Sequence, residues 1–185
     1  MTREYPIYDA ETAPAEAKPL LEGVISAYGF IPNSLGVMAA SPPVLEAYLS
    51  LSALLEKTTL TDRERFVVML AASRAAECAY CVPAVSTLAK MQGAPAGIVE
   101  RIRDERPLDD PRLEALRRLA TRMVRKQGRV SEEDIGEFVA SGHTHPQVFE
   151  VLLISLTKLL AIYVNHAVGT PLDEAFQPER WTAVA

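Results

Sequence analysis

The sequence is poor in the residues on which several common kinds of site depend. Its 185 residues contain three histidines, two cysteines and one tryptophan, and aromatic residues make up 6% of the chain. The 19 Lys and Arg residues are outnumbered by 24 Asp and Glu, and no basic cluster occurs. Because a nucleic-acid-binding face needs concentrated positive charge, we expect no nucleic-acid partner. We also expect no resident cofactor, since no cofactor-binding motif is present.

The sequence shows neither the pattern of a signal peptide nor a clear membrane-spanning segment. The first residues, MTREYPIYDAETAP, are polar and acidic, unlike a signal peptide. The most apolar stretch, residues 148–168, is interrupted by Glu150, Lys158 and His166, so we predict a buried core helix rather than a span. We therefore expect a cytoplasmic protein with no membrane partner, in a compartment where thiols stay reduced.

No segment alternates apolar and polar residues with the period of a strand, and helix signals occur throughout. Thr61 and Glu64 have the spacing of a capping box, and Asp110 followed by Pro111 marks another helix start. We predict an all-α, multi-helical single domain over residues 1–185, with an N-terminal and a C-terminal arm. The expected helices cover about 15–28, 35–40, 42–57, 62–78, 81–92, 95–104, 111–127, 131–141, a long core helix from 146 and a short helix within 170–181. The high apolar fraction, 49%, favours a homo-oligomer.

The two cysteines, Cys78 and Cys81, form a CxxC pair within ECAYCVPAV. Pro83 is tolerated in the first turn of a helix, which places Cys81 near a helix N-terminus. Backbone N–H groups and the helix dipole favour a thiolate there, so Cys81 is the candidate nucleophile and Cys78 the resolving thiol. The spacing also allows a disulfide. Three alternatives remain: two core cysteines, a catalytic pair that has become idle, or half of a zinc site completed by His143 and His145.

Longer stretches of sequence around this pair resemble a known family. LTDRERFVVMLAASRAAECAYCVPAV resembles the core motif of the AhpD-like, carboxymuconolactone decarboxylase superfamily. FIPNSLGVMAASPPVLEAYLSL and NHAVGTPLD resemble its peroxidase-related branch, and the likeness extends over about residues 15–176. The resemblance implies an all-helical fold, a trimer or hexamer, and a hydroperoxide substrate attacked by Cys81. It further implies that Cys78 closes a disulfide, which a lipoyl-bearing or thioredoxin-like partner reduces.

The chain departs from the family motif at two positions. Redox members have a glutamate twelve positions before the first cysteine and a histidine four after the second, where this sequence has Phe66 and Val85. Because apolar surroundings disfavour a thiolate, we expect Cys81 to be mostly protonated and its peroxide chemistry to be slow. Two alternatives follow: a non-catalytic oligomeric module that kept the fold, and a decarboxylase-type enzyme, for which the sequence shows no obvious group of residues that would hold a carboxylate.

Few polar residues are available as a substitute base. Glu64 has a sufficient structural role in the capping box, and His166 fits the last turn of its helix. His143 and His145 are expected to lie in a solvated loop. Arg74 and Tyr80, near the cysteines, are interpreted first as a surface charge and a packing residue.

Overall fold

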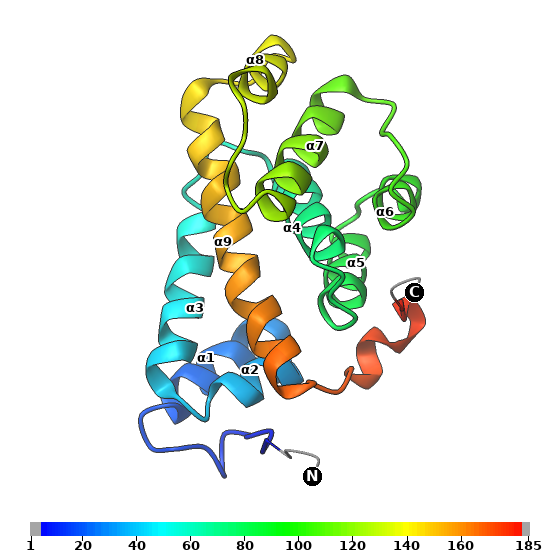
Figure 1. The fold of residues 1–185 in the computed structure, drawn as a ribbon. Coiled ribbons are helices and arrows are strands. Elements are labelled where there is room, and N and C mark those ends of the chain that lie inside the picture. The colour runs from blue at the N-terminus through cyan, green and yellow to red at the C-terminus, as the bar shows by residue number, and fades with distance from the viewer. Residues whose placement is uncertain (1–4, 183–185) are drawn as a thin grey trace.

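The long helix α9 (His145–Val168) runs through the molecule, and several of the other helices pack against it (Figure 1). The structure is a computed structural model that describes residues 5–182, and within that range it is all-α, with no strand. Ahead of α9 lie α1 (Lys18–Tyr28), α2 (Asn33–Met38), α3 (Pro42–Leu55), α4 (Asp62–Ala75), α5 (Cys81–Met91), α6 (Ala96–Arg103), α7 (Pro111–Arg125) and α8 (Glu132–Ala140). A 3-10 helix, η1 (Glu174–Glu179), follows α9.

The caps explain why the helices begin where they do. The capping box of α4 forms as predicted: the Glu64 backbone N–H donates to Thr61 Oγ1 at 3.3 Å, and Glu64 Oε2 accepts from the Thr61 N–H at 2.8 Å. Asp110 Oδ1 accepts from the first backbone N–H groups of α7. Each contact satisfies donors that have no partner inside a helix, and a cap of this kind contributes about 1 kcal/mol.

Two predicted boundaries differ from the structure by three residues, more than the others do. The first helix begins at Lys18 rather than near Ala15. The helix before the cysteines ends at Ala75 rather than near Cys78, because Glu77 has a left-handed backbone (φ 54°). A left-handed residue ends a helix by turning the next N–H back, and here the Cys78 N–H donates to the Ser73 carbonyl at 3.1 Å.

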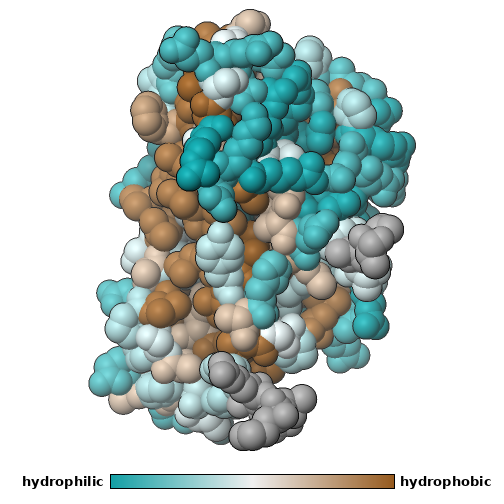
Figure 2. Space-filling view, in the orientation of Figure 1, coloured by the Kyte–Doolittle hydropathy of each residue, from teal (hydrophilic) through white to brown (hydrophobic). Residues whose placement is uncertain are grey.

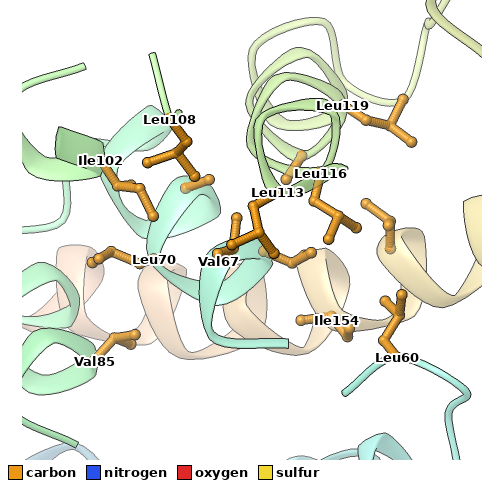
Figure 3. Close-up of a cluster of buried hydrophobic side chains, with 14 of the residues drawn as sticks. Leu60, Val67, Leu70, Val85, Ile102, Leu108, Leu113, Leu116, Leu119 and Ile154 are labelled. Carbon is orange, nitrogen blue, oxygen red and sulfur yellow. The ribbon is translucent and has the colours of Figure 1, made fainter. Parts of the chain in front are cut away.

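The main hydrophobic core lies where α4, α7 and α9 meet. Val67, Leu116 and Ile154, one from each of these helices, are at most 1% exposed and point into the same cluster (Figure 3). A second cluster joins α1, α2 and α3 to the later part of α9. A third, smaller cluster surrounds the two cysteines and includes Phe176 of η1. The C-terminal arm is thereby packed against α5.

Within residues 5–182, α9 is the one helix whose length and composition would allow it to cross a membrane. In the fold α3, α4 and α7 pack against it, and its residues Val151, Ile154 and Ile162 are fully buried. It is therefore a core helix in this structure, as the sequence predicted. One side of α9 still reaches the surface, and Figure 2 shows apolar residues gathered along it, next to the hydrophilic region of α7 and α8.

Candidate active site

The turn between α4 and α5 brings the two cysteines together. Cys81 is the first residue of α5, as the position of Pro83 predicted. No side-chain oxygen caps this helix; instead the Cys81 N–H donates to Cys78 Sγ at 3.2 Å. Both cysteines are free thiols, and they are 0% and 1% exposed. The pair therefore lies at a helix N-terminus, where the dipole favours negative charge, but inside the protein rather than at its surface.

The second wall of the site comes from α9. Lys158, Ile162 and Asn165 lie four and three residues apart, a spacing that puts them on one face of a helix. Asn165 Nδ2 donates to Cys81 Sγ at 3.3 Å. Lys158 lines the same cavity as Cys81 and is 8% exposed. A buried ammonium and an amide donor thus face the sulfur from a helix about 80 residues later in the chain.

These contacts decide which sulfur carries charge. Burial raises the pKa of Cys81, but the hydrogen bond from the Cys78 thiol, the Lys158 ammonium and the Asn165 amide outweigh it and lower the pKa to about 7. The hydrogen bond to Cys81, together with burial, raises the pKa of Cys78. These contacts therefore favour the Cys81 thiolate, in the direction opposite to the effect of burial. The expectation of a mostly protonated Cys81 considered only the apolar neighbours in the motif and did not include Lys158 and Asn165.

Lys158 remains an ammonium at neutral pH. Burial lowers its pKa, but its acidic neighbours, Tyr48, Cys81, Cys78 and Tyr28, raise it when they are ionised, and the net direction is upward. A charge that is buried without an oppositely charged neighbour would instead lose its proton. The thiolate and the ammonium therefore stabilise each other.

A polar contact closes the other side of the site. The Tyr80 hydroxyl donates to Asp173 Oδ2 at 2.6 Å and accepts from the Ser34 N–H at 3.2 Å. The Tyr80 ring also meets Phe176 edge to face. Burial and the bond to Asp173 raise the pKa of Tyr80. The expected packing role of Tyr80 is correct, and its hydroxyl additionally joins α2, α5 and the C-terminal arm.

A cavity leads from the surface to Cys81. An outer hollow of about 330 Å³ and an inner one of about 70 Å³ share five lining residues: Tyr28, Tyr48, Val85, Leu88 and Lys158. Cys81 and Asn165 line the inner hollow, and Phe66 lines the outer one. Phe66 and Val85 thus do present hydrocarbon to the site, as the resemblance implied. Lys158 lies where the two hollows join.

Comparison with known proteins identifies the fold and a family match over part of the chain. Residues 42–122 match the sequence model of the carboxymuconolactone decarboxylase family. A solved structure of an alkylhydroperoxidase AhpD core, a peroxidase-related protein from Ralstonia eutropha JMP134, has a TM-score of 0.81 at 21% identity and covers 93% of each chain. The chain has the AhpD-like fold, and its residues 42–122 match the carboxymuconolactone decarboxylase family. No curated protein is similar enough in sequence to count as a match.

Two further solved structures have the same fold. A peroxidase-related protein from Silicibacter sp. TM1040 has a TM-score of 0.80 at 19% identity, covering 95% of this chain and 93% of that one. A cysteine-to-alanine variant of the debrominase Bmp8, in complex with 2,3,4-tribromopyrrole, has a TM-score of 0.81 at 16% identity, covering 96% and 95%. At such identities the likeness shows a shared fold, while the chemistry depends on the residues of the site.

The substitute bases considered from the sequence of this AhpD-like chain lie elsewhere. Glu64 is held by its capping box and by an ion pair with Arg112 at 2.8 Å. His143 was expected to be solvated but is 3% exposed, with its ring stacked on Phe138 at 4.3 Å between centroids. His145 and His166 are exposed.

Arg74 does not act on the cysteines either. It donates to the Arg103 carbonyl, pairs with Glu105 and Glu77, and stacks over Trp181. Instead of being a free surface charge, Arg74 ties α4 to α6 and to the C-terminal arm. The zinc alternative is not supported either: among residues 5–182, no three His, Cys, Asp or Glu side chains form a group that could hold a metal ion.

Sequence reasoning missed Lys158 and Asn165. Lys158 was noted only as an interruption of an apolar stretch, and Asn165 belonged to the NHAVGTPLD segment that carried part of the resemblance. The available signal was a charged residue within an otherwise apolar helix, since a buried Lys is rarely retained without a partner. That signal does not show which residues the lysine meets.

Proposed function

We propose that this protein is a thiol–disulfide oxidoreductase that reduces hydroperoxides, with Cys81 as the nucleophile and Cys78 as the resolving thiol. One observation carries the proposal: a buried ammonium, an amide donor and a neighbouring thiol all act on Cys81 Sγ and lower its pKa to about 7. A structural cysteine in an apolar core would have its pKa raised instead. A cavity also leads to this sulfur.

The reaction follows from this arrangement. The Cys81 thiolate attacks the distal oxygen of the peroxide, an S–O bond forms, and the O–O bond breaks to give a sulfenic acid and the alkoxide, which takes up a proton as an alcohol. The Cys78 thiol then attacks the Cys81 sulfur, the disulfide forms and water leaves. An external dithiol reduces the disulfide and returns both thiols. Two electrons pass from that dithiol to the peroxide.

Lys158 and Asn165 take over part of what the family's glutamate and histidine do. That relay removes the thiol proton through a base, whereas here the thiolate is stabilised by charge and by a hydrogen bond. Phe66 and Val85 then serve as apolar walls of the cavity. The attraction between two buried charges is stronger than it would be in water.

The test is a set of rate measurements on reduced protein. We expect alkylation of Cys81 to follow a pKa near 7, and a stoichiometric amount of cumene hydroperoxide to yield the Cys78–Cys81 disulfide in one turnover. Cys78→Ala should stop at a sulfenic acid that dimedone traps, and Cys81→Ala should leave the peroxide unconsumed. A Cys81 thiol that titrates near the free value of about 8.5 and fails to consume peroxide would favour the non-catalytic module.

The reductant proposed for this centre is a cytoplasmic lipoyl-bearing or thioredoxin-like dithiol. Cys78 is 0% exposed, packed with Phe176 and Leu172 of the C-terminal arm. A small dithiol entering through the cavity therefore has an advantage over a protein surface that must dock onto the sulfur. Steady-state turnover with dihydrolipoamide against turnover with reduced thioredoxin distinguishes the two reductants.

Reductive dehalogenation is a second candidate, favoured by the shared fold with a debrominase that binds 2,3,4-tribromopyrrole. The electron balance is the same: two thiols become a disulfide, halide leaves the ring and a proton takes its place. The cavity beside Cys81 is lined by Tyr28, Tyr48 and Phe66, which suits a flat ring. Release of bromide from a brominated pyrrole by the reduced protein, measured against Cys81→Ala, tests this candidate.

A homo-oligomer, trimeric or hexameric as in the family, is proposed as the working form. Phe149, Leu156 and Tyr163 on α9 are 72%, 52% and 64% exposed and recur every seven residues, so they form a stripe on one side of the helix. A hollow lined by Leu152, Leu159 and other apolar residues of α7 and α9 lies beside this stripe. Large exposed apolar stripes mark interfaces. Sedimentation of Leu156→Glu should show smaller species than the unchanged protein.

A further inference from the structure

Lys158 has no carboxylate partner among residues 5–182. Within this range, the lysines that form ion pairs are Lys90 with Glu179 and Lys126 with Asp134. Lys158 is more buried than either, at 8% exposed, and its side chain lines both hollows of the cavity. Of the acidic groups that raise the pKa of Lys158, Cys81 is the one whose own pKa is lowered to about 7, so its thiolate is the counterion near neutral pH.

That charge disappears when the protein reacts. A sulfenic acid or a disulfide at Cys81 is neutral, so after the first step Lys158 would be a buried cation without a counterion. Such a charge is strongly unfavourable. The reaction, however, produces a new anion, because the electron pair of the broken O–O bond leaves on the departing oxygen. Lys158 lies in the wall of the cavity in which that oxygen is released.

The site also has little with which to protonate the leaving group. The carboxylates of the outer hollow, Glu56 and Asp62, are both bound to Arg65. The Tyr80 hydroxyl already donates its hydrogen bond to Asp173. Lys158 keeps its proton while an anion lies beside it, because a neighbouring negative charge favours the ammonium. The remaining groups, the Tyr28 and Tyr48 hydroxyls, are phenols and hence weak acids.

We propose that this site is selective for electrophiles whose leaving group departs as a stable organic anion, peroxy acids above all, and that Lys158 pairs first with the Cys81 thiolate and then with that anion. This inference rests on the proposed role of Cys81. With a peroxy acid, the thiolate attacks the terminal hydroxyl oxygen, the S–O bond forms, the O–O bond breaks, and a carboxylate leaves without needing a proton. The charge moves from sulfur to carboxylate while Lys158 stays in place.

The cavity agrees with this class of substrate. Its outer hollow of about 330 Å³ is at the small end of ligand pockets, about 300–1,000 Å³. Tyr48, Val85 and Leu88 provide apolar contacts for the body of the molecule. In the inner hollow the Ser34 hydroxyl and the Asn165 amide oxygen are buried and have no hydrogen-bond partner within the described chain. Both can accept the hydroxyl proton of a peroxy acid and orient its terminal oxygen.

The main experiment compares leaving groups. Single-turnover rates are measured for peroxyacetic acid and tert-butyl hydroperoxide, and the ratio of the two rates is compared with the ratio for a small free thiolate. We expect the protein's ratio to be at least tenfold larger. For Lys158→Met, each rate is first divided by the fraction of Cys81 that is thiolate. The ratio of the two rates should then fall to that of the free thiolate. Lys57→Met, which changes an exposed lysine, is the control and should leave the ratio unchanged. A wild-type ratio equal to that of the free thiolate overturns the proposal, yet leaves the proposed function intact if both peroxides are reduced.

A binding measurement tests the same inference without turnover. By calorimetry, benzoate should bind the disulfide form at least tenfold more tightly than the reduced form at pH 8, where Cys81 is mostly thiolate. Benzamide, its uncharged analogue, should not distinguish the two forms. Lys158→Met should abolish the preference for benzoate. Equal binding of benzoate to both redox forms overturns the proposal, whatever the peroxide rates are.

Discussion

The two halves of α9 are equally apolar in sequence yet do different things in the fold. In the first half, Val151 and Ile154 are 0% exposed and fill the main core with α4 and α7. In the second half, Lys158 and Asn165 are nearly as buried, at 8% and 3%, but face the cysteines. The first half therefore stabilises the fold, and the second supplies the electrostatics of the site.

The difference shows how a buried charge can be identified as functional. Removing an ammonium from water is costly, and an apolar residue of similar size would be tolerated in the same position at least as well. Lys158 therefore lowers stability or leaves it unchanged, while it lowers the pKa of Cys81. Four predictions test this division of α9, in decreasing order of expected effect.

Lys158→Met should affect the chemistry most. Without the ammonium, we expect the pKa of Cys81 to rise from about 7 to at least its usual value near 9. The thiolate fraction at pH 7 then falls from about one half to about 1%, so alkylation by iodoacetamide should slow roughly fifty-fold. The free energy of unfolding should stay the same or increase. An unchanged alkylation profile would show that the second half of α9 does not act on the sulfur.

Ile154→Ala should lower the stability of the fold and leave the ionisation of Cys81 unchanged. Truncation of a fully buried aliphatic side chain in the main core leaves a cavity, and we expect the free energy of unfolding to fall by about 2–5 kcal/mol. The pKa of Cys81 should not move. Urea denaturation and alkylation at several pH values measure both properties. If the pKa shifts as well, the two halves of the helix are coupled.

Stability should depend on pH through Cys81. The pKa of Cys81 is about 7 in the folded protein and near 9 in the unfolded chain. Between these two pH values the unfolded chain binds more protons than the folded protein does. The free energy of unfolding therefore rises with pH across that range. The gain is complete above about pH 9, is lost as the pH falls through 7, and amounts to at most about 3 kcal/mol, since each pKa unit corresponds to 1.36 kcal/mol.

The difference in free energy of unfolding between wild type and Cys81→Ala, measured by denaturation from pH 6 to 8.5, isolates this effect from other titrating groups. Cys78 has the opposite effect on stability. Its pKa is raised in the folded protein, so the free energy of unfolding falls once the pH is high enough to ionise this thiol in the unfolded chain. In a Lys158→Met background this difference in the free energy of unfolding should depend less on pH. A pH dependence that persists there would assign the effect to Asn165 and to the helix dipole.

Restoring the family's residues, Phe66→Glu with Val85→His, should have the smallest effect, and in a direction that the motif alone would not predict. A carboxylate at position 66 would line the outer hollow next to Lys158 and compete with the thiolate for the ammonium. We expect the pKa of Cys81 to rise by about one unit, since a nearby opposite charge shifts a pKa by about 1–3 units. Phe66→Gln is the matched control without the charge. A lower pKa in the double variant would instead show that the relay works beside Lys158.

Sequence alone determined much of the fold. The capping residues Thr61 and Asp110 are local signals, and each marks a helix boundary in the structure. The placement of Cys81 at a helix start was equally local, since it depended on Pro83 two residues away. Such features depend on hydrogen bonds within a few residues, so they can be predicted without knowing what packs against what.

The ionisation of Cys81 was decided by the tertiary structure. Its sulfur meets Asn165, 84 positions later in the chain, and the ammonium of Lys158 on the same helix. The periodicity of α9 shows that these two residues share a face, but it does not show that this face meets α5. A pKa depends on every charge and dipole within a few ångströms, whichever part of the chain supplies it. The motif around the cysteines therefore identified the nucleophile, and only the packing of α9 against it determined its charge.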